Sequence, residues 1–184
     1  MLAKTVYYLT GMGGRLDTGL GQGLLSRGIT IVGRELVDEF RRLDFQQQID
    51  LVADDLNNKF WSDDSYVIAN SFGAYIFLHA QAQLPQYVGN VMLLSPIVGE
   101  FGNEDTQMNF IPPRADKLME LAEAGSYPVP LNCQIHVGEE DWQSNPKNVT
   151  TFGRMLGIDV NVVPKAGHML PVPYVSDLLD KWLG

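Results

Sequence analysis

Hydrophobic residues along the chain fall into short, nearly unbroken runs separated by longer stretches of mixed polarity. Runs of about 4–8 residues rich in β-branched, aromatic and other apolar side chains predict strands. Six such runs occur, at residues 5–10, 29–33, 66–69, 91–94, 134–137 and 158–163. Because most of these runs are apolar throughout, they are typical of strands that are buried on both faces of a sheet.

The stretches between these runs carry the spacing of helices. Apolar side chains recur at helical spacing at Phe45, Ile49, Val52, Leu56 and Phe60. Asp44 precedes this series and is a residue type that caps helix N-termini. Further helices are predicted at residues 16–26, 72–84, 116–124, 146–156 and 173–183. Pro85, Gly125 and Gly157 follow three of them, as expected where helices end.

Strands that alternate with helices of this length predict βαβ crossovers and a mostly parallel sheet covered by helices on both faces. A chain of 184 residues without repeats or linkers is expected to form one domain, residues 1–184. Residues 99–130 are its least regular part. In such sheets, ligands bind beyond the carboxyl ends of the strands. The loops that follow the strands are therefore the place to look for chemistry.

Three polar residues fall in three of those loops. Ser71 comes two residues after the third strand, directly before a helix, whereas Asp141 and His168 follow the fifth and sixth strands. The segment around the serine reads ANSFG (residues 69–73). A tight strand-to-helix turn that presents a nucleophile needs small residues two positions before and two positions after that nucleophile. The N–H groups of the helix that starts there favour negative charge at the site.

The order Ser…Asp…His, with each residue after a successive strand, resembles that of the α/β-hydrolase family. The segment ANSFG looks like the family's G-x-S-x-G elbow, with Ala69 in place of the first glycine. The segments GEED (residues 138–141) and GH (residues 167–168) would supply the other two residues. The segment LTGMGG (residues 9–14) is similar to the family's His-Gly-x oxyanion loop, with Thr10 where histidine is common.

The resemblance covers essentially the whole chain and implies a minimal α/β-hydrolase fold. The expected architecture is a three-layer α/β/α sandwich whose six strands lie in the order 2-1-3-4-5-6. The chain looks like the small, nearly lid-less serine hydrolases, with residues 99–130 as a short cap-like insertion. The resemblance further implies that Ser71 is the nucleophile, His168 the base and Asp141 the residue that orients the base. The backbone N–H groups of Met12 and Phe72 would bind the oxyanion.

Several alternatives remain open at individual positions. Ser71 could simply cap a helix, because serine is a favoured N-cap residue. Glu139 or Glu140 could orient His168 in place of Asp141, and Asp105 is a weaker substitute. The other histidines, His79 within a predicted helix and His136 within a predicted strand, are expected to be structural.

Composition and charge exclude several classes of binding partner. A net charge of −9 argues against nucleic acid and against anionic membrane surfaces. No apolar run approaches the roughly 20 residues that span a bilayer, and the N-terminal apolar run is short for a secretory signal, so a cytoplasmic location is expected. The single cysteine, Cys133, excludes an intramolecular disulfide and is expected to be buried. The three histidines are scattered without the spacing of metal ligands, which argues against a metal site, and the G-x-G-x-x-G nucleotide pattern fails at Leu16.

The sequence therefore predicts an enzyme that needs no cofactor and cleaves a small carboxylic ester or thioester through an acyl-enzyme. A peptidase or amidase would use the same residues. A non-catalytic binding protein on a hydrolase scaffold is the alternative from another class. The aromatic and methionine residues of the irregular segment, Phe101, Met108 and Phe110, fit either a substrate pocket or simple packing. The sequence carries no signal of the oligomeric state.

Overall fold

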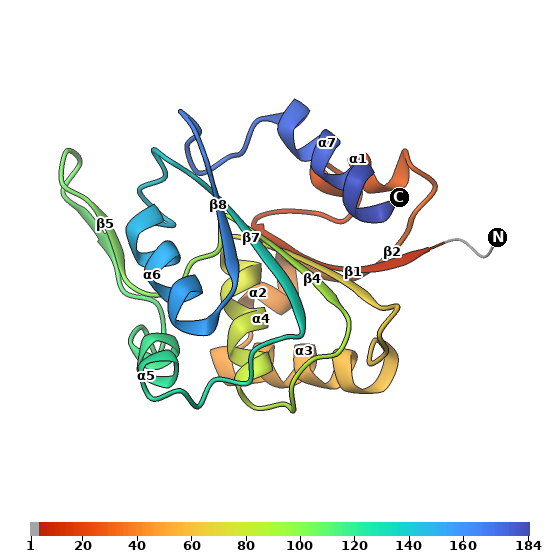
Figure 1. The fold of residues 1–184 in the computed structure, drawn as a ribbon, viewed down its shortest axis with the longest axis horizontal. Helices are drawn as coiled ribbons and strands as arrows, with labels where there is room; N and C mark the ends of the chain where they lie inside the picture. The colour runs from red at the N-terminus through yellow and green to blue at the C-terminus, as the bar shows by residue number, and fades with distance from the viewer. Residues whose placement is uncertain (1–3) are drawn as a thin grey trace.

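A computed structural model describes residues 4–184 and contains a central sheet of six parallel strands within them (Figure 1). The strands lie in the order β2-β1-β3-β4-β7-β8. Their bounds are β1 (Thr5–Met12), β2 (Thr30–Leu36), β3 (Tyr66–Asn70), β4 (Asn90–Leu94), β7 (Asn132–Gly138) and β8 (Asp159–Val163). Parallel neighbours all along the sheet mean that every strand ends at the same edge.

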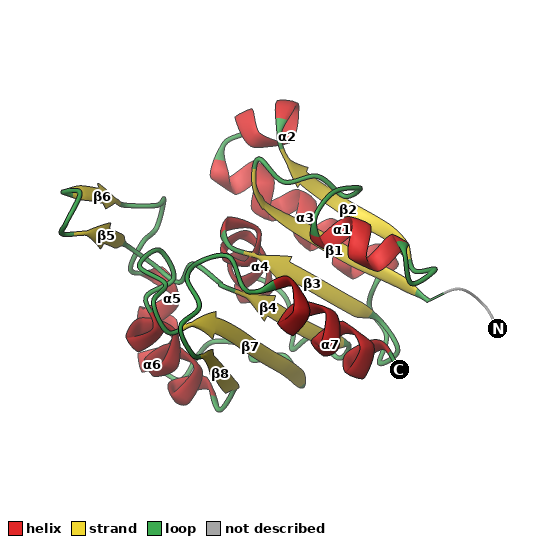
Figure 2. Ribbon diagram, turned by 90° about the horizontal axis from the view of Figure 1, so that it is seen from above, coloured by secondary structure: helices red, strands yellow, loops and turns green. Residues whose placement is uncertain are grey.

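Helices cover both faces of this sheet (Figures 1 and 2). The helices α1 (Leu20–Leu25) and α7 (Val172–Leu183) cover one face. The other face carries α3 (Phe45–Lys59), α4 (Phe72–Ala82), α5 (Lys117–Glu123) and α6 (Pro146–Leu156). A hydrophobic core lies on each face of the sheet, and successive side chains of a strand point into the two cores in turn. In β1, Tyr7 packs on the α3–α4 side and Tyr8 on the α1–α7 side. The predicted three-layer α/β/α fold is confirmed.

Local sequence explains where several helices begin and end. The carboxylate of Asp44 accepts the N–H of Gln47, whose side chain in turn accepts the N–H of Asp44, so α3 starts in a capping box. The side chain of Asn145 accepts the N–H groups of the first turn of α6. Gly157 ends α6 at φ 70°, a left-handed conformation that glycine adopts without a steric penalty.

The structure differs from the sequence prediction in three elements. Helix α1 starts at Leu20 instead of residue 16, because the N–H of Leu16 is bound by the carboxylate of Glu35 and Gly19 turns the chain at φ 52°. Helix α2 (Asp38–Arg42) was not predicted, because five residues are too few to show a helical repeat. The antiparallel hairpin of β5 (Phe101–Asn103) and β6 (Met108–Phe110) was not predicted either.

The hairpin and α5 make up most of residues 99–130, and the hairpin extends away from the rest of the molecule (Figures 1 and 2). Its strands have three residues each, so they are too short for a reliable alternating pattern. Because the hairpin takes the numbers β5 and β6, the fifth and sixth predicted strands are β7 and β8, and the predicted order of the sheet strands is retained. Helix α5 was predicted at nearly its observed position.

None of the helices formed by residues 4–184 combines the length and the apolar character that crossing a membrane requires.

Two buried histidines make the stability of the fold depend on pH. Burial lowers the pKa of His79 to about 4, helped by the nearby charges of Arg114 and Lys117, and burial alone lowers that of His136 to about 4. In the unfolded chain both pKa values return to about 6.5. Below pH 6.5 the unfolded chain therefore binds protons that the folded chain does not. The stabilisation is complete above pH 6.5 and is lost as the pH falls towards 4.

We expect urea unfolding at pH 5 to give a free energy of unfolding lower than at pH 7.5, by roughly 1–2 kcal/mol for each histidine. The variant His79→Gln keeps a polar side chain that does not titrate in this range. The difference between its free energies of unfolding at pH 7.5 and pH 5 should therefore be smaller than that of the wild type by the contribution of one histidine. Equal pH dependence in the wild type and His79→Gln would contradict this account of His79.

Candidate active site

Ser71 occupies a sharp turn between β3 and α4. Its backbone has φ 53° and ψ −117°, a conformation that residues other than glycine rarely adopt. Its N–H donates to the carbonyl of Leu94, and its carbonyl accepts the N–H of Tyr75. Its side chain makes no capping hydrogen bond to α4. The simple N-cap alternative therefore does not describe this serine, and its hydroxyl is directed elsewhere.

The small residues beside Ser71 have a steric reason. A methyl group on Gly73 would lie 2.3 Å from the carbonyl oxygen of Thr10 and 2.7 Å from that of Leu9. The first turn of α4 thus packs directly against the backbone of β1, which any larger residue at position 73 would push away. Ala69, two residues before the serine, is fully buried in β3. This close approach explains why the segment ANSFG has small residues on both sides of Ser71.

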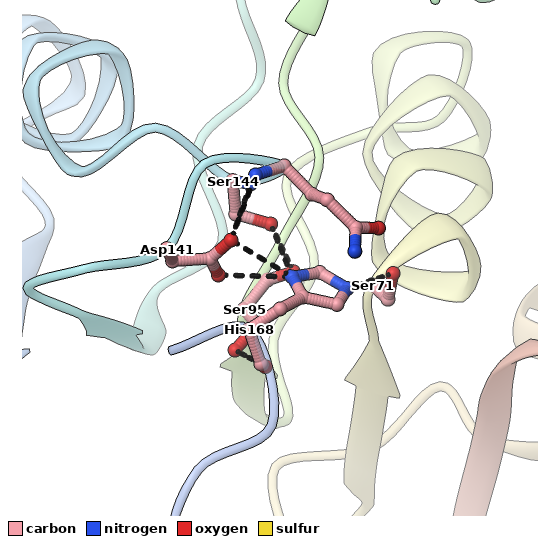
Figure 3. A network of polar contacts seen from close by, with 6 residues as sticks. Ser71, Ser95, Asp141, Ser144 and His168 are labelled. Atoms are coloured by element: carbon pink, nitrogen blue, oxygen red, sulfur yellow. Dashed lines mark hydrogen bonds and ion pairs between the residues drawn. The ribbon is translucent and has the colours of Figure 1, made fainter. Parts of the chain in front are cut away.

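The side chains of Ser71, His168 and Asp141 meet at the carboxyl edge of the sheet (Figure 3). The Oγ atom of Ser71 lies 2.8 Å from Nε2 of His168. Both carboxylate oxygens of Asp141 approach Nδ1 of the same ring, at 3.0 and 2.9 Å. The Asp141 side chain is completely shielded from solvent, whereas the His168 side chain is 23% exposed. The imidazole therefore lies between a buried carboxylate and a hydroxyl at the protein surface.

Backbone donors fix the carboxylate that faces His168. The N–H groups of Gln143 and Ser144 donate to Oδ1 of Asp141 at 2.9 and 2.8 Å. These two donors hold the carboxylate in its orientation towards the ring. Glu139 instead accepts the N–H of Lys165, at 2.9 Å.

The other alternative carboxylates belong to exposed residues. Glu140 is exposed, and Asp105 lies in the exposed turn of the β5–β6 hairpin. Among the acidic residues considered from the sequence, Asp141 is the one whose carboxylate contacts the imidazole.

The segment that carries Met12 runs beside Ser71. A methyl group on Gly11 would lie 3.3 Å from Cβ of Ser71. The N–H of Gly13 donates to the carbonyl of Leu36 in β2, at 3.0 Å. Phe72 is the first residue of α4, a position whose N–H has no acceptor within the helix.

Thr10 holds the segment of residues 11–14 in place. Its side chain is fully buried; the hydroxyl donates to the carbonyl of Gly14 at 3.2 Å and accepts the N–H of Leu36 at 2.9 Å. The threonine thus ties this segment to β2, at the position where the family commonly has histidine.

Two serines that were not predicted to belong to the site contact His168 (Figure 3). The hydroxyl of Ser95 donates to the backbone carbonyl of His168, and the hydroxyl of Ser144 donates to that of Ser95. The position of Ser95 directly after β4, at the carboxyl edge, was the one available signal. Ser144 carries no sequence signal of its own.

The remaining candidates lie apart from this cluster. His79 packs edge-on against Tyr75 in α4, and His136 contacts the hydroxyl of Tyr174 and the side chain of Gln134. Cys133, which was expected to be buried, is only partly buried and packs against the core. Burial raises the pKa of its thiol to about 12, so the thiol stays protonated at neutral pH. Within residues 4–184, no group of three or more His, Cys, Asp or Glu side chains is arranged to hold a metal ion.

The parallel sheet order, the serine on a strand-to-helix turn and the residues at the strand ends define an α/β hydrolase. The family model for serine hydrolases matches residues 44–172, a range that includes Ser71, Asp141 and His168. The chain belongs to this serine hydrolase family and is an enzyme with hydrolase activity. Among curated proteins, none matches the sequence.

Solved structures agree with this fold. The ydeN gene product of B. subtilis has 12% sequence identity and a TM-score of 0.67, over 98% of this chain and 99% of that chain. A structure from a study of carboxylesterases of the thaumarchaeon Nitrososphaera gargenis has 16% identity and a TM-score of 0.66, over 99% and 90% of the two chains. Est1E from Butyrivibrio proteoclasticus has 14% identity and a TM-score of 0.66, over 98% and 87%. At these identities the likeness concerns the fold.

Proposed function

We propose that this hydrolase cleaves a small carboxylic ester or thioester through an acyl-enzyme formed on Ser71. The observation that carries the proposal is the continuous chain of contacts from Ser71 Oγ through the imidazole of His168 to the carboxylate of Asp141. A nucleophile within hydrogen-bonding reach of a base, which is itself held by a third group, is the arrangement that activates a serine hydroxyl.

In the proposed reaction, Oγ of Ser71 attacks the substrate carbonyl while Nε2 of His168 takes the hydroxyl proton. The C–O or C–S bond to the leaving group then breaks, and His168 returns the proton to that group. A water molecule next attacks the acyl-enzyme, with His168 again removing a proton, which is passed to Ser71 as the acid product leaves. Asp141 keeps the second ring proton on Nδ1 and stabilises the imidazolium.

The tetrahedral intermediate carries a negative oxygen, which we place against the backbone N–H groups of Met12 and Phe72. Support comes from the position of Phe72 at the start of α4, where the helix dipole favours negative charge, and from the closeness of Gly11 to Ser71. Preorganised donors of this kind each contribute about 3–4 kcal/mol to acyl transfer.

The β5–β6 hairpin is proposed as the short cap of the substrate site. The ring of Phe101 lies 5.9 Å from that of Trp142, the residue after Asp141, and 5.1 Å from that of Phe110. These contacts connect the hairpin to the loop that carries Asp141. Met108 and Phe110 are largely exposed on the hairpin.

A fluorophosphonate probe tests the proposal, because it reacts covalently with activated serines. We expect the wild-type protein to be labelled once, on the peptide that contains Ser71, and to hydrolyse p-nitrophenyl esters, with short acyl chains preferred. Amide substrates in the same assay test a peptidase or amidase activity. A well-folded protein that neither takes up the probe nor hydrolyses any ester would instead be a binding protein on a hydrolase scaffold.

Thr10 offers a test of the proposed oxyanion segment. Thr10→Val keeps the shape of the side chain but leaves the N–H of Leu36 without its hydroxyl partner. We expect kcat to fall about 10-fold, less than the loss of an oxyanion donor itself, with a stability loss of about 1–3 kcal/mol. Thr10→Ser retains the hydroxyl and should keep most of the activity. If Thr10→Val matches the wild type in kcat, the segment does not depend on this hydroxyl.

A further inference from the structure

Two buried serines join three loops of the site (Figure 3). Ser95 follows β4, and its hydroxyl donates a hydrogen bond of 2.8 Å to the backbone carbonyl of His168 in the loop after β8. Ser144, in the loop after β7, donates a hydroxyl hydrogen bond of 2.6 Å to the backbone carbonyl of Ser95. Each residue is only 1% exposed. These bonds therefore connect the loop of the base to the loop of the carboxylate through the end of β4.

Ser144 also lies beside the ring of His168. Its N–H donates to Oδ1 of Asp141 at 2.8 Å, and its Oγ is 3.5 Å from Nδ1 of His168. Because its hydroxyl proton is directed to the carbonyl of Ser95, Oγ presents lone pairs to the ring. The Nδ1 proton is thus surrounded by acceptors only, the two oxygens of Asp141 and Oγ of Ser144. This environment favours a single tautomer, with the proton on Nδ1.

Ser95 is held in an unfavourable backbone conformation. Its φ is 45°, in the left-handed region, although the residue is not glycine. Its N–H donates to the carbonyl of His136 at 2.7 Å, so the backbone continues the pairing of β4 with β7. Strained residues of this kind persist where the surrounding hydrogen bonds and packing hold the backbone in place, and they cluster at functional sites. At Ser95 the conformation directs the hydroxyl to the His168 backbone.

We propose that Ser95 and Ser144 are positioning residues for the hydrolysis, an inference that rests on the proposed function. Ser95 sets the place of His168 relative to Ser71, and Ser144 assists Asp141 in holding the tautomer and the tilt of the ring. Neither serine touches the reacting atoms. Their loss should therefore slow the chemical step and leave substrate binding nearly unchanged.

The test compares Ser144→Ala and Ser95→Gly with the wild type. Glycine at position 95 removes the hydroxyl and adopts a positive φ without strain, so this variant is expected to fold. For p-nitrophenyl acetate we expect kcat to fall about 10- to 100-fold in each variant, with KM changed by less than about threefold. The rate of inactivation by the fluorophosphonate should fall in parallel with kcat. The proton resonance of His168 Nδ1–H should shift in Ser144→Ala.

The matched control is Ser65→Ala. Ser65 is also a buried serine, but it lies before β3 at the opposite edge of the sheet, and its hydroxyl contacts Ser62. This variant should keep the wild-type kcat and the wild-type Nδ1–H resonance. Loss of kcat in Ser65→Ala equal to that in Ser144→Ala would mean a general effect of removing buried hydroxyls, and would overturn the inference.

Two negative results have different meanings. If the fluorophosphonate labels the wild type but Ser95→Gly and Ser144→Ala both keep kcat within about twofold, the positioning role is wrong and the proposed function stands. If the wild type is neither labelled nor active, the proposed function itself fails, and the inference fails with it. Unfolding of both variants would assign the two serines to stability alone and would also overturn the positioning role.

Discussion

Replacing Ser71 with alanine is expected to lower kcat for ester hydrolysis by at least about 10⁴-fold and to abolish fluorophosphonate labelling. The reason is that Oγ, 2.8 Å from Nε2 of His168, is the atom that would form the acyl-enzyme. His168→Ala removes the base and should reduce activity by a similar factor. The effects of the two substitutions should not add in the double variant, because the residues act as a unit. Stopped assays with p-nitrophenyl acetate and mass spectrometry of the labelled protein measure both effects.

The loss should be one of chemistry and not of folding. The Ser71 side chain makes no capping bond to α4, so alanine removes no contact that holds the helix. Ser71→Gly is a useful companion, because glycine adopts φ 53° freely and should leave the protein at least as stable as Ser71→Ala. Both variants should be inactive with wild-type circular dichroism. Residual activity of Ser71→Ala within 10-fold of the wild type, an amount about 10³ above the expected value, would rule out Ser71 as nucleophile.

Gly138→Ala is expected to damage both stability and activity, because β7 ends against the loop of His168. A methyl group at position 138 would lie 2.2 Å from the carbonyl oxygen of Gly167 and 2.3 Å from that of Ala166. These contacts are with backbone, which cannot move aside without shifting His168 itself. We expect a stability loss of about 1–3 kcal/mol. We also expect kcat to fall about 10- to 100-fold, since small misplacement of a catalytic group has effects of this size.

Gly167→Ala is the matched control, because it adds the same methyl group one residue before His168. At that position nothing lies within 4 Å of the added carbon, and φ is outside the left-handed region. Stability should change by no more than about 0.5 kcal/mol and kcat by no more than about twofold. Thermal unfolding and ester kinetics of the two variants side by side measure the comparison. If Gly167→Ala is the more damaging of the two, the contact of Gly138 with this loop is not what limits the site.

Much of the fold could be predicted because its signals are local. Helix α3 was predicted with Asp44 as its cap, since helical spacing and the capping residue lie within one short stretch, and the structure confirms both. The inner strands β1, β3 and β4 were predicted because strands buried on both faces are apolar throughout. The edge strands β2 and β8 are only partly buried, and their β-branched residues made them recognisable. The β5–β6 hairpin was missed for the opposite reason. Its strands are short and largely exposed, so no burial pattern marks them.

The candidate site was predictable only in part. Ser71, Asp141 and His168 stand out because parallel strands end at one edge, which makes order along the chain a guide to position in space. Which of Glu139, Glu140 and Asp141 faces His168 depends on how the loop after β7 turns. In the structure that turn is set by the N–H of Glu140 donating to the carbonyl of Ala166 and by the N–H groups that bind Asp141. The spacing of hydrophobic residues in the sequence does not predict the conformation of such a loop.

The sequence by itself determined the alternation of strands and helices, the loops that carry polar residues and the small side chains around Ser71. The alternation of strands and helices depends on contacts between near neighbours in the chain. The small residues around Ser71 were visible as a motif, although Gly73 is small because it meets Thr10 and Leu9 of β1. Only the tertiary structure decided that Ser95 and Ser144 lie beside His168, that Thr10 ties the segment after β1 to β2, and that Gly138 lies against the His168 loop. These contacts join segments that are distant in sequence. A single hydroxyl or glycine acquires its role there only when the packed sheet brings its partner within a few ångströms.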